Sequence, residues 1–528
     1  MKNKHIISAA STLLIGFTAM AQESTGWHLQ DPATDSVVGT SVERSYTELL
    51  KDKTPKKKVI VAILDSGVEI EHEDLKGNLW VNEDEIPGNG IDDDNNGYID
   101  DIHGWNYLGN ANGENIEYDN LEYVRMLNGF IKKFDGVSEK EVAKADKKDY
   151  ELYLELQKEW KSSMDEANGN LMQMNAVQAM LAGNINKIKE HLNVEKLTMT
   201  DVKNMETEDE DLNKAAAFLG LFETEDLDGM MNELDGVMEY FQSIVNHHLN
   251  LEENSRAIVG DDPNDYSDSN YGNPDVFGGS GEHGSHVAGI VGATRDNDLG
   301  MKGAADYVEL MAVRMVPNGD ERDKDVANGI RYAVDNGADI LNMSFGKMYS
   351  PGKAEVENAI RYAEANGVLI IHAAGNDNKN IDKEIHYPYH KYSDGKMAQN
   401  WIVVGASDMH SDSLKASFSN YGKKTVDIFA PGVAINSTVP ENTYEENNGT
   451  SMASPLVAGI AALIWTYYPE LSPVELKEVI MSSGTDYKNQ KVAVRMNGET
   501  KEVKFKKLCA SGKVINAYNA LLQLESQD

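Results

Sequence analysis

The sequence predicts an α/β protein built on a doubly wound, mostly parallel sheet, with an inserted, mainly α-helical domain. Two observations lead to this prediction. In residues 58–106 and 257–528, short apolar runs rich in β-branched residues alternate with helical patterns, as in a parallel sheet covered on both faces. Between these parts, residues 107–256 carry a Glu-, Lys-, Met- and Leu-rich helical periodicity without strand patterns.

The individual elements follow from these patterns. Residues 59–64 form a nearly continuous β-branched run, which is typical of a strand buried on both faces. Further strands are expected at 309–316, 339–343, 368–373, 401–406 and 426–430, and helices near 42–50 and at 325–336 and 353–365. In the insertion, helices are expected at 142–164, 171–192 and 227–251. From 472 to 522 we expect a helix, a short polar β-like segment and a closing segment.

The chain has 528 residues and a net charge of −38, which argues against non-specific binding to nucleic acid or to an anionic membrane, because both need a basic face. Residues 1–21 have the pattern of a secretory signal peptide, with two lysines before an apolar segment and small residues at Ala19 and Ala21. We therefore expect an exported protein, periplasmic or extracellular, with a lead segment at 22–57 and no membrane span after signal removal. An N-terminal anchor is the alternative. The single cysteine, Cys509, excludes an intramolecular disulfide.

One hydroxyl stands in an unusual place. Ser451 ends a small turn and precedes the run 456–465, which is apolar on every side and therefore predicts a buried helix. Pro455 falls in the first turn, where its missing N–H has no intrahelical partner to lose. The hydroxyl then lies beside free backbone N–H groups at the positive end of the helix dipole, a site suited to developing negative charge. A capping serine is the alternative interpretation.

Two other residues could serve such a hydroxyl. Asp65 follows the first expected strand, and open α/β sheets keep their sites at the carboxyl edge. His283 opens a Gly-, Ala- and Val-rich helix at 283–293. An acid after a strand, a histidine at a helix start and a serine at a buried helix start are, in this chain order, the parts of a nucleophilic triad. Asp65 as a turn or helix-cap residue is the alternative.

The segments around these residues resemble the motifs of the subtilase family of serine peptidases. The matching segments are ILDSG at 63–67, HGSHVAG at 283–289 and GTSMASP at 449–455, and the segments 342–346, 373–376, 417–422 and 430–432 match as well. The resemblance covers about 58–106 and 270–485 and leaves the helical insertion outside. It implies a subtilisin-like fold and a serine endopeptidase that acts on protein or peptide substrates.

The resemblance also implies roles. Ser451 would attack the scissile carbonyl once His283 removes its proton, and Asp65 would hold the imidazole in the required tautomer. Asn376 would donate to the oxyanion together with the Ser451 backbone N–H. Extended substrate would pair with Ser344, Phe345 and Gly346, and a wall of the primary pocket would come from Ala374 and Gly375. His286 is the other candidate base, and Asp377 suggests a preference for a basic side chain at the cleavage position.

Residues 89–101 carry the D-x-D-x-N-G-x-x-D opening of an oxygen-rich calcium loop. The expected ligands are Asp92, Asp94, Asn96, the carbonyl of Tyr98, and Asp100, with Asp101 closing the site. His103 stands where an EF-hand would place its bidentate Glu, so the loop is at best EF-like. A structural calcium ion is therefore expected, and a solvated turn is the alternative.

Two departures from the family pattern carry information. First, too few residues separate Ala21 from Asp65 for the usual separate inhibitory propeptide. Second, the insertion lies between the Asp and His motifs, and this position suggests that it acts as a lid or substrate selector.

A non-catalytic binding protein on a subtilase scaffold is the alternative function, and a calcium-dependent adhesive protein is a third. The intact set of four catalytic groups argues against the binding protein, which has no need of them, and the presence of one expected calcium loop without repeats argues against the adhesive protein.

Overall fold

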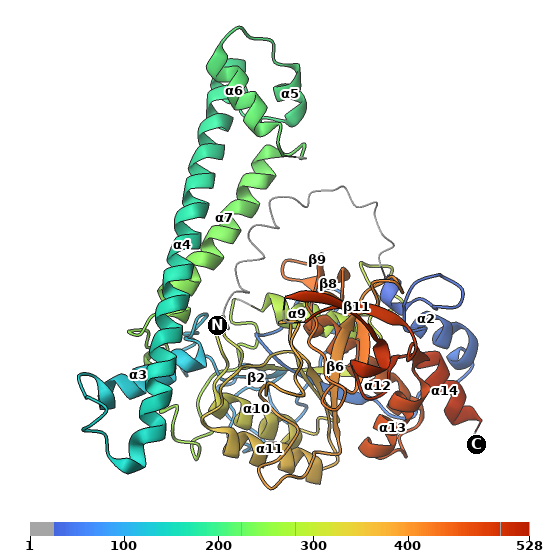
Figure 1. Ribbon diagram of the computed structural model, residues 1–528. Coiled ribbons are helices and arrows are strands. Elements are labelled where there is room, and N and C mark those ends of the chain that lie inside the picture. The colour runs from blue at the N-terminus through green and yellow to red at the C-terminus, as the bar shows by residue number, and fades with distance from the viewer. Residues whose placement is uncertain (1–25, 223, 280, 497, 527–528) are drawn as a thin grey trace. The chain divides into compact units, whose positions relative to one another are not determined.

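The computed structural model describes residues 26–222, 224–279, 281–496 and 498–526 (Figure 1). The expected signal peptide at 1–21 and the first residues of the lead segment lie outside these ranges. The chain divides into two compact units. The helical unit is Tyr123–Glu253, and the sheet unit comprises the described residues up to Glu122 and from Asn254 onward. Residues 107–122 and 254–256 of the expected insertion thus belong to the sheet unit, and the assignment of functional domains stays a proposal.

Within the described residues, the sheet unit contains a nine-stranded sheet of order β10-β13-β7-β6-β5-β4-β1-β3-β2. Its strands are β1 (Val59–Asp65), β2 (Gly104–Asn106), β3 (Val308–Arg314), β4 (Ile340–Met343), β5 (Leu369–Ala373), β6 (Trp401–Ser407), β7 (Ile428–Pro431), β10 (Thr485–Asp486) and β13 (Lys513–Val514). All neighbours pair in parallel except β10 and β13. The parallel register brings the ends of β1, β4 and β5 to one edge, where the site lies.

Helices cover both faces of this sheet. They are α2 (Val42–Arg44), α8 (Arg256–Val259), α9 (Glu282–Gly292), α10 (Asp323–Asp335), α11 (Lys353–Ala365), α12 (Thr450–Tyr467), α13 (Pro473–Ser483) and α14 (Ala517–Glu525). Val61 and Ile63 of β1 pack into one core with α9 and α12, whereas Ala62 and Leu64 pack into another with α10 and α11. The prediction of a doubly wound α/β sheet is therefore confirmed.

The helix α12 is apolar around its whole circumference because it lies inside the sheet unit. Of the helices that the structure describes, it is the one long and apolar enough to cross a membrane, and 94% of its apolar window is buried in the protein. The expected buried helix after Ser451 is therefore a core helix of the sheet unit, beginning at Thr450.

The expected strands and helices of the sheet unit match the structure to within two residues at their ends. The expected helix near 42–50 is α2, continued by the π-helical segment Ser45–Leu50. The sequence reading missed β2 and the antiparallel hairpin of β8 (Ile435–Val439) and β9 (Thr443–Asn447). The sequence of β9, TYEEN, is largely exposed and lacks alternating apolar residues, so it carries no strand pattern. A second hairpin, β11 (Lys491–Met496) and β12 (Glu499–Lys504), is the expected polar β-like segment.

The helical unit differs from expectation in its longest helix. Its helices are α3 (Glu122–Phe134), α4 (Lys147–Leu192), α5 (Met199–Asn204), α6 (Glu210–Leu219) and α7 (Leu227–Ser243). The prediction of two helices at 142–164 and 171–192 is wrong, because α4 runs through the intervening residues. Asn168 there donates to the carbonyl of Met164, and Gly169 costs the helix only about 1 kcal/mol. The hydrophobic core that α4 forms with α6 and α7 offsets this cost. It includes Ile185, Ile188, Leu212, Leu219 and Leu227.

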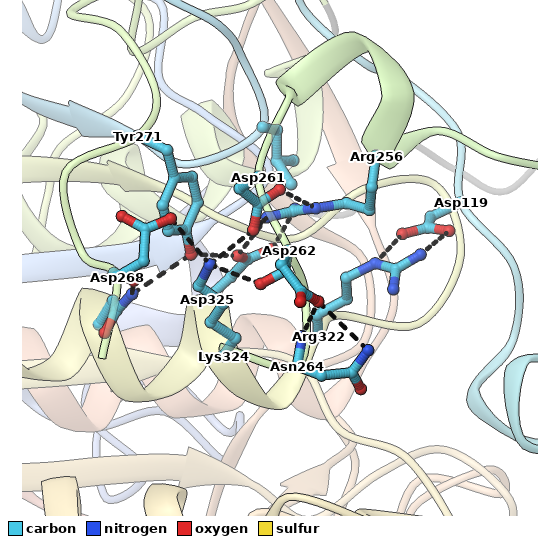
Figure 2. Close-up of polar contacts among 12 residues, drawn as sticks. Asp119, Arg256, Asp261, Asp262, Asn264, Asp268, Tyr271, Arg322, Lys324 and Asp325 are labelled. Atoms are coloured by element: carbon cyan, nitrogen blue, oxygen red, sulfur yellow. Dashed lines mark hydrogen bonds and ion pairs between the residues drawn. The ribbon is translucent and has the colours of Figure 1, made fainter. Parts of the chain in front are cut away.

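Buried ion pairs join two segments of the sheet unit to the start of α10 (Figure 2). In the sequence, one segment precedes the helical unit and the other follows it. Before that unit, Asp119 binds Arg322 at 2.6 Å. After it, Arg256 binds Asp325 at 2.9 Å and Asp261 at 2.6 Å, and Lys324 binds Asp261 at 2.8 Å (Figure 2). These contacts lie within the sheet unit, and they fix the segment that leads on to His283.

Candidate active site

Asp65 and His283 form the first part of the site. Asp65 is the last residue of β1 and is 1% exposed, whereas the imidazole of His283, in the first turn of α9, is 42% exposed. The carboxylate Oδ1 accepts from the backbone N–H of Ser66 at 2.7 Å and from His283 Nδ1 at 2.6 Å. Because the carboxylate accepts, Nδ1 carries the proton, and Nε2 of the neutral imidazole keeps its lone pair.

The pKa of His283 reflects two opposing effects. Burial lowers this pKa, but the negative charge and the hydrogen bond of Asp65 outweigh burial, so the pKa lies above its usual value of 6.5. His283 is therefore neutral, with Nε2 able to accept a proton, only above this raised pKa. The imidazolium that would form during proton transfer is stabilised by the same carboxylate.

Ser451 lies in the first turn of α12, which begins at Thr450. The expectation that Pro455 falls in the first turn is wrong, because the helix begins earlier than expected and Pro455 lies inside it. The Ser451 hydroxyl donates to the backbone carbonyl of Ser344 at 3.1 Å. Within the part of the chain that the structure describes, no hydrogen bond joins this hydroxyl to His283. Catalytic hydrogen bonds often form only when substrate is bound, so the contact with Ser344 marks the resting orientation of the hydroxyl.

Asn376 is attached to the same helix start. Its Oδ1 accepts from the backbone N–H of Thr450 at 2.9 Å and from the Thr450 hydroxyl at 3.0 Å, and that hydroxyl in turn accepts from the Gly375 N–H at 3.0 Å. An oxygen that accepts from a backbone N–H fixes the orientation of the amide. The NH2 group of Asn376 is thus left to donate beside the N-terminus of α12, as an oxyanion donor must.

The segment after β4 touches the nucleophile directly. The Ser344 hydroxyl donates to the Ser451 carbonyl at 3.1 Å and lies 2.9 Å from the hydroxyl of Ser454. The Phe345 carbonyl already pairs with Nε2 of His372 at 3.0 Å. Of the three residues expected to pair with substrate, Ser344 and Phe345 thus already use their carbonyls within the protein, and Gly346 makes no backbone hydrogen bond among the described contacts.

His286, the other candidate base, lies in a different environment. It is fully buried, its Nε2 lies 3.0 Å from the carbonyl of Glu445, and burial lowers its pKa to about 4. The structure places His283, and not His286, against Asp65.

The expected calcium loop divides into two groups of residues. Carboxylate oxygens of Asp92 and Asp94 lie within 4.8 Å of each other and of Glu85, which the sequence reading missed. Glu85 stands before the loop and accepts from the N–H groups of Asp93, Asp94 and Asp100, so no spacing rule within the loop could find it. Three converging carboxylates are a donor set that suits a hard cation such as calcium.

The remaining loop residues make other contacts. Asp100 accepts from the backbone N–H groups of Asn89 and Gly90. Asp101 is buried and accepts from Asn82, Asn96 and Tyr332, and burial raises its pKa to about 6. Asn96 also accepts from the Tyr98 N–H at 2.8 Å, and the Tyr98 ring is buried against Trp105. These contacts shape the loop around the three carboxylates.

The chain has matches among known protein families, known sequences and solved structures. The profile of the Subtilase family (Peptidase_S8) matches residues 56–498. Subtilisin DY of Bacillus licheniformis is 40% identical over 206 residues, which are 39% of this chain and 70% of that protein. Subtilisin Savinase of Lederbergia lenta is 39% identical over 215 residues, 40% of this chain and 74% of that protein. A solved protease of Pseudoalteromonas arctica PAMC 21717 covers 46% of this chain and 70% of its own at 28% identity, with a TM-score of 0.37.

The chain belongs to the subtilase family, as the resemblance of its motifs predicts. It is a subtilisin-like serine endopeptidase, and its substrates are proteins or peptides.

Proposed function

We propose that this endopeptidase is exported and hydrolyses peptide bonds through an acyl-enzyme on Ser451. The observation that carries the proposal is the 2.6 Å hydrogen bond between Asp65 Oδ1 and His283 Nδ1, at the sheet edge where Ser451 and Asn376 meet the segments after β4 and β5. Export is supported by the signal-like residues 1–21 and leads to the periplasm or the exterior.

The reaction has two stages. Nε2 of His283 takes the proton of the Ser451 hydroxyl while Oγ attacks the scissile carbonyl carbon, and Asp65 stabilises the imidazolium. The imidazolium then protonates the leaving amine, which departs and leaves the acyl group on Ser451. A water molecule repeats the sequence with His283 as base, releases the acid product and restores the hydroxyl.

The negative charge of each tetrahedral intermediate would lie between two donors. These are the NH2 group of Asn376 and the backbone N–H of Ser451, at the positive end of the dipole of α12. Such a donor is typically worth about 3 kcal/mol of transition-state stabilisation. The pairing of Asn376 Oδ1 with Thr450 supports this role, because it fixes the amide before substrate binds.

The substrate would lie extended along the segment after β4. Gly346 supplies backbone groups for it, and Ala374 and Gly375, after the neighbouring strand β5, form the opposite wall. The helical unit lies in the chain between Asp65 and His283, and we propose that it selects among protein substrates.

We also propose a structural calcium ion in the loop at 89–101. Glu85, Asp92 and Asp94 would hold it, and the ion would offset two of the three negative charges whose mutual repulsion otherwise opposes the folded loop. This role is distinct from the chemistry at Ser451, because the three carboxylates make no contact with the catalytic residues among the described contacts.

A fluorophosphonate probe tests the proposed nucleophile. The wild type is expected to label covalently, and Ser451→Ala is expected to remain unlabelled while keeping the wild-type circular dichroism spectrum. Labelling of Ser451→Ala equal to that of the wild type, or failure of the folded wild type to label with and without calcium, would contradict the proposal.

A further inference from the structure

The residue that precedes the scissile bond must place its side chain in a space defined by two segments. Residues 344–346 and 374–376 follow the neighbouring parallel strands β4 and β5 and both contact the first turn of α12. A carbonyl held between Ser451 and Asn376 therefore has its side chain directed between these segments. The primary specificity pocket is this space.

The imidazole of His386 occupies the floor of this space. Its Cε1 lies 2.2 Å from the position that a β-carbon on Gly346 would take. Its Nε2 lies 3.2 Å from the corresponding position on Gly375. The ring thus lies in contact with both glycines, one on each wall, and it fills the space from one wall to the other.

Backbone pairing holds His386 in this position. The next residue, Tyr387, exchanges two hydrogen bonds with Lys347, each of 2.9 Å, and Lys347 directly follows Gly346. The segment of His386 is thereby fixed as a neighbour of the wall at 344–346. The ring of His372 lies on the other side, with ring centroids 6.1 Å apart. The backbone at His386 is therefore held beside Gly346, with the ring of His372 as a neighbour of the imidazole.

Little room is left behind the imidazole. The cavity bordered by Ala373, Ala374, His372 and His386 measures about 10 Å³, which is room for about one water molecule. A long or aromatic side chain entering between the walls would meet the His386 ring before its own atoms were buried.

The floor of the pocket carries no formal charge at neutral pH. Burial lowers the pKa of His386, and the negative charge of Asp377 opposes this only in part. Nδ1 of His386 is buried and has no hydrogen-bond partner among the described residues. Asp377 itself is exposed and lies 3.4 Å from the Asn420 amide that donates to it. A neutral floor at short depth offers no partner to the end of a lysine or arginine side chain.

We infer that His386 closes the primary specificity pocket and restricts cleavage to peptide bonds that follow small residues, namely glycine, alanine and serine. The inference rests on the proposed function, because that function places substrate between the segments 344–346 and 374–376. It replaces the hypothesis that Asp377 selects a basic side chain, since such a side chain is too long for the space in front of His386.

Peptide substrates that differ only in the residue before the scissile bond test this inference. For the wild type, kcat/KM with alanine is expected to exceed kcat/KM with phenylalanine or lysine by at least about tenfold. His386→Gly removes the ring, so the ratio of phenylalanine to alanine cleavage is expected to rise at least about tenfold. His410→Ala, which changes an exposed histidine of the sheet unit, is the control and is expected to leave the ratio unchanged.

The results separate this inference from the proposed function. Comparable cleavage after alanine and phenylalanine by the wild type overturns it, as does an unchanged ratio in a His386→Gly protein that labels with fluorophosphonate. If His386→Gly fails to fold, the same ratio is measured for His386→Ser, and an unchanged ratio there overturns the inference. The preference of the wild type for alanine over phenylalanine tests it without any variant. Failure of the wild type to label at Ser451 would overturn the proposed function, whatever the preference at this position.

Discussion

The hydrogen bond between Asp65 and His283 can be broken with almost no change in shape by Asp65→Asn. Asparagine has the size of aspartate, but its NH2 group donates to Nδ1 instead of accepting from it. This favours the tautomer in which Nε2 carries the proton, and that nitrogen can no longer take the proton of Ser451. The variant also lacks the charge that stabilises the imidazolium. We expect kcat to fall by about four orders of magnitude, or about 5.5 kcal/mol of transition-state stabilisation.

The same substitution has a consequence for the pH profile. In the wild type, Asp65 raises the pKa of His283 above 6.5 against the effect of burial. Without the carboxylate, the pKa of His283 is expected to fall from its raised value, so the residual activity is retained to lower pH. Steady-state hydrolysis of a peptide substrate between pH 4 and 9, with active-site titration of the folded fraction, measures both effects.

Asp296→Asn is the matched control, because it changes an exposed carboxylate of the same unit in the same way. It is expected to leave kcat and the pH profile unchanged. Retention of more than about a tenth of the wild-type kcat in a folded Asp65→Asn protein would refute the assigned role of Asp65.

Three further predictions follow from the site and from the two units. Asn376→Ala removes one oxyanion donor and is expected to lower kcat by about 100- to 1000-fold with little change in KM, and an equal rise in KM instead would contradict the role. Chelation of calcium is expected to lower the melting temperature; if the free calcium concentration was 100 times the Kd, the free energy of unfolding falls by about 2.7 kcal/mol. Glu85→Gln should abolish this response, and the control Asp84→Asn should keep it. Replacing residues 124–253 with a flexible linker is expected to broaden cleavage of folded proteins while leaving peptide hydrolysis unchanged, and unchanged selectivity would count against a selecting role.

The fold and three of the four proposed catalytic residues could be predicted from sequence because each stands at a locally encoded position, whereas Asn376 was indicated only by the resemblance to the subtilase motifs. Asp65 follows a β-branched run, His283 opens a helix, and Ser451 precedes an apolar run, so each local pattern indicates its residue. The doubly wound sheet then brings strand ends and helix starts to one edge, as parallel sheets do. The chain order Asp, His, Ser required no knowledge of distances.

Residues whose positions depend on contacts outside a local pattern could not be predicted in this way. Glu85 joins Asp92 and Asp94 only because its carboxylate accepts backbone N–H groups of the loop, and no periodicity marks such contacts. His386 lies beside Gly346 because Tyr387 pairs with Lys347, a contact between distant segments. The continuity of α4 was missed for a different reason, since tertiary packing in the helical unit overrides a local break signal at Gly169.

The ion cluster of Figure 2 leads to a prediction about stability. Arg256→Ala removes the ion-pair partner of Asp325 and one of the two partners of Asp261; both side chains are 0% exposed, and Lys324 still pairs with Asp261. Breaking such a buried pair is expected to lower the free energy of unfolding by about 3–5 kcal/mol, because one carboxylate charge stays buried without compensation. Arg331→Ala, which changes a half-exposed arginine on the same helix α10, is the control and should cost less than about 1 kcal/mol.

The loss should depend on pH in a defined direction. Burial raises the pKa of Asp325, and the charge of Arg256 opposes that rise, so the pKa of Asp325 must increase further in Arg256→Ala. A carboxyl group whose pKa is higher in the folded than in the unfolded protein binds more protons when folded, and stability then falls as pH rises through that range. Thermal unfolding at pH 5 and pH 8 is therefore expected to show the larger deficit of Arg256→Ala at pH 8. An equal deficit at both pH values would mean that lost packing of the arginine side chain, and not the uncompensated charge of Asp325, sets the cost.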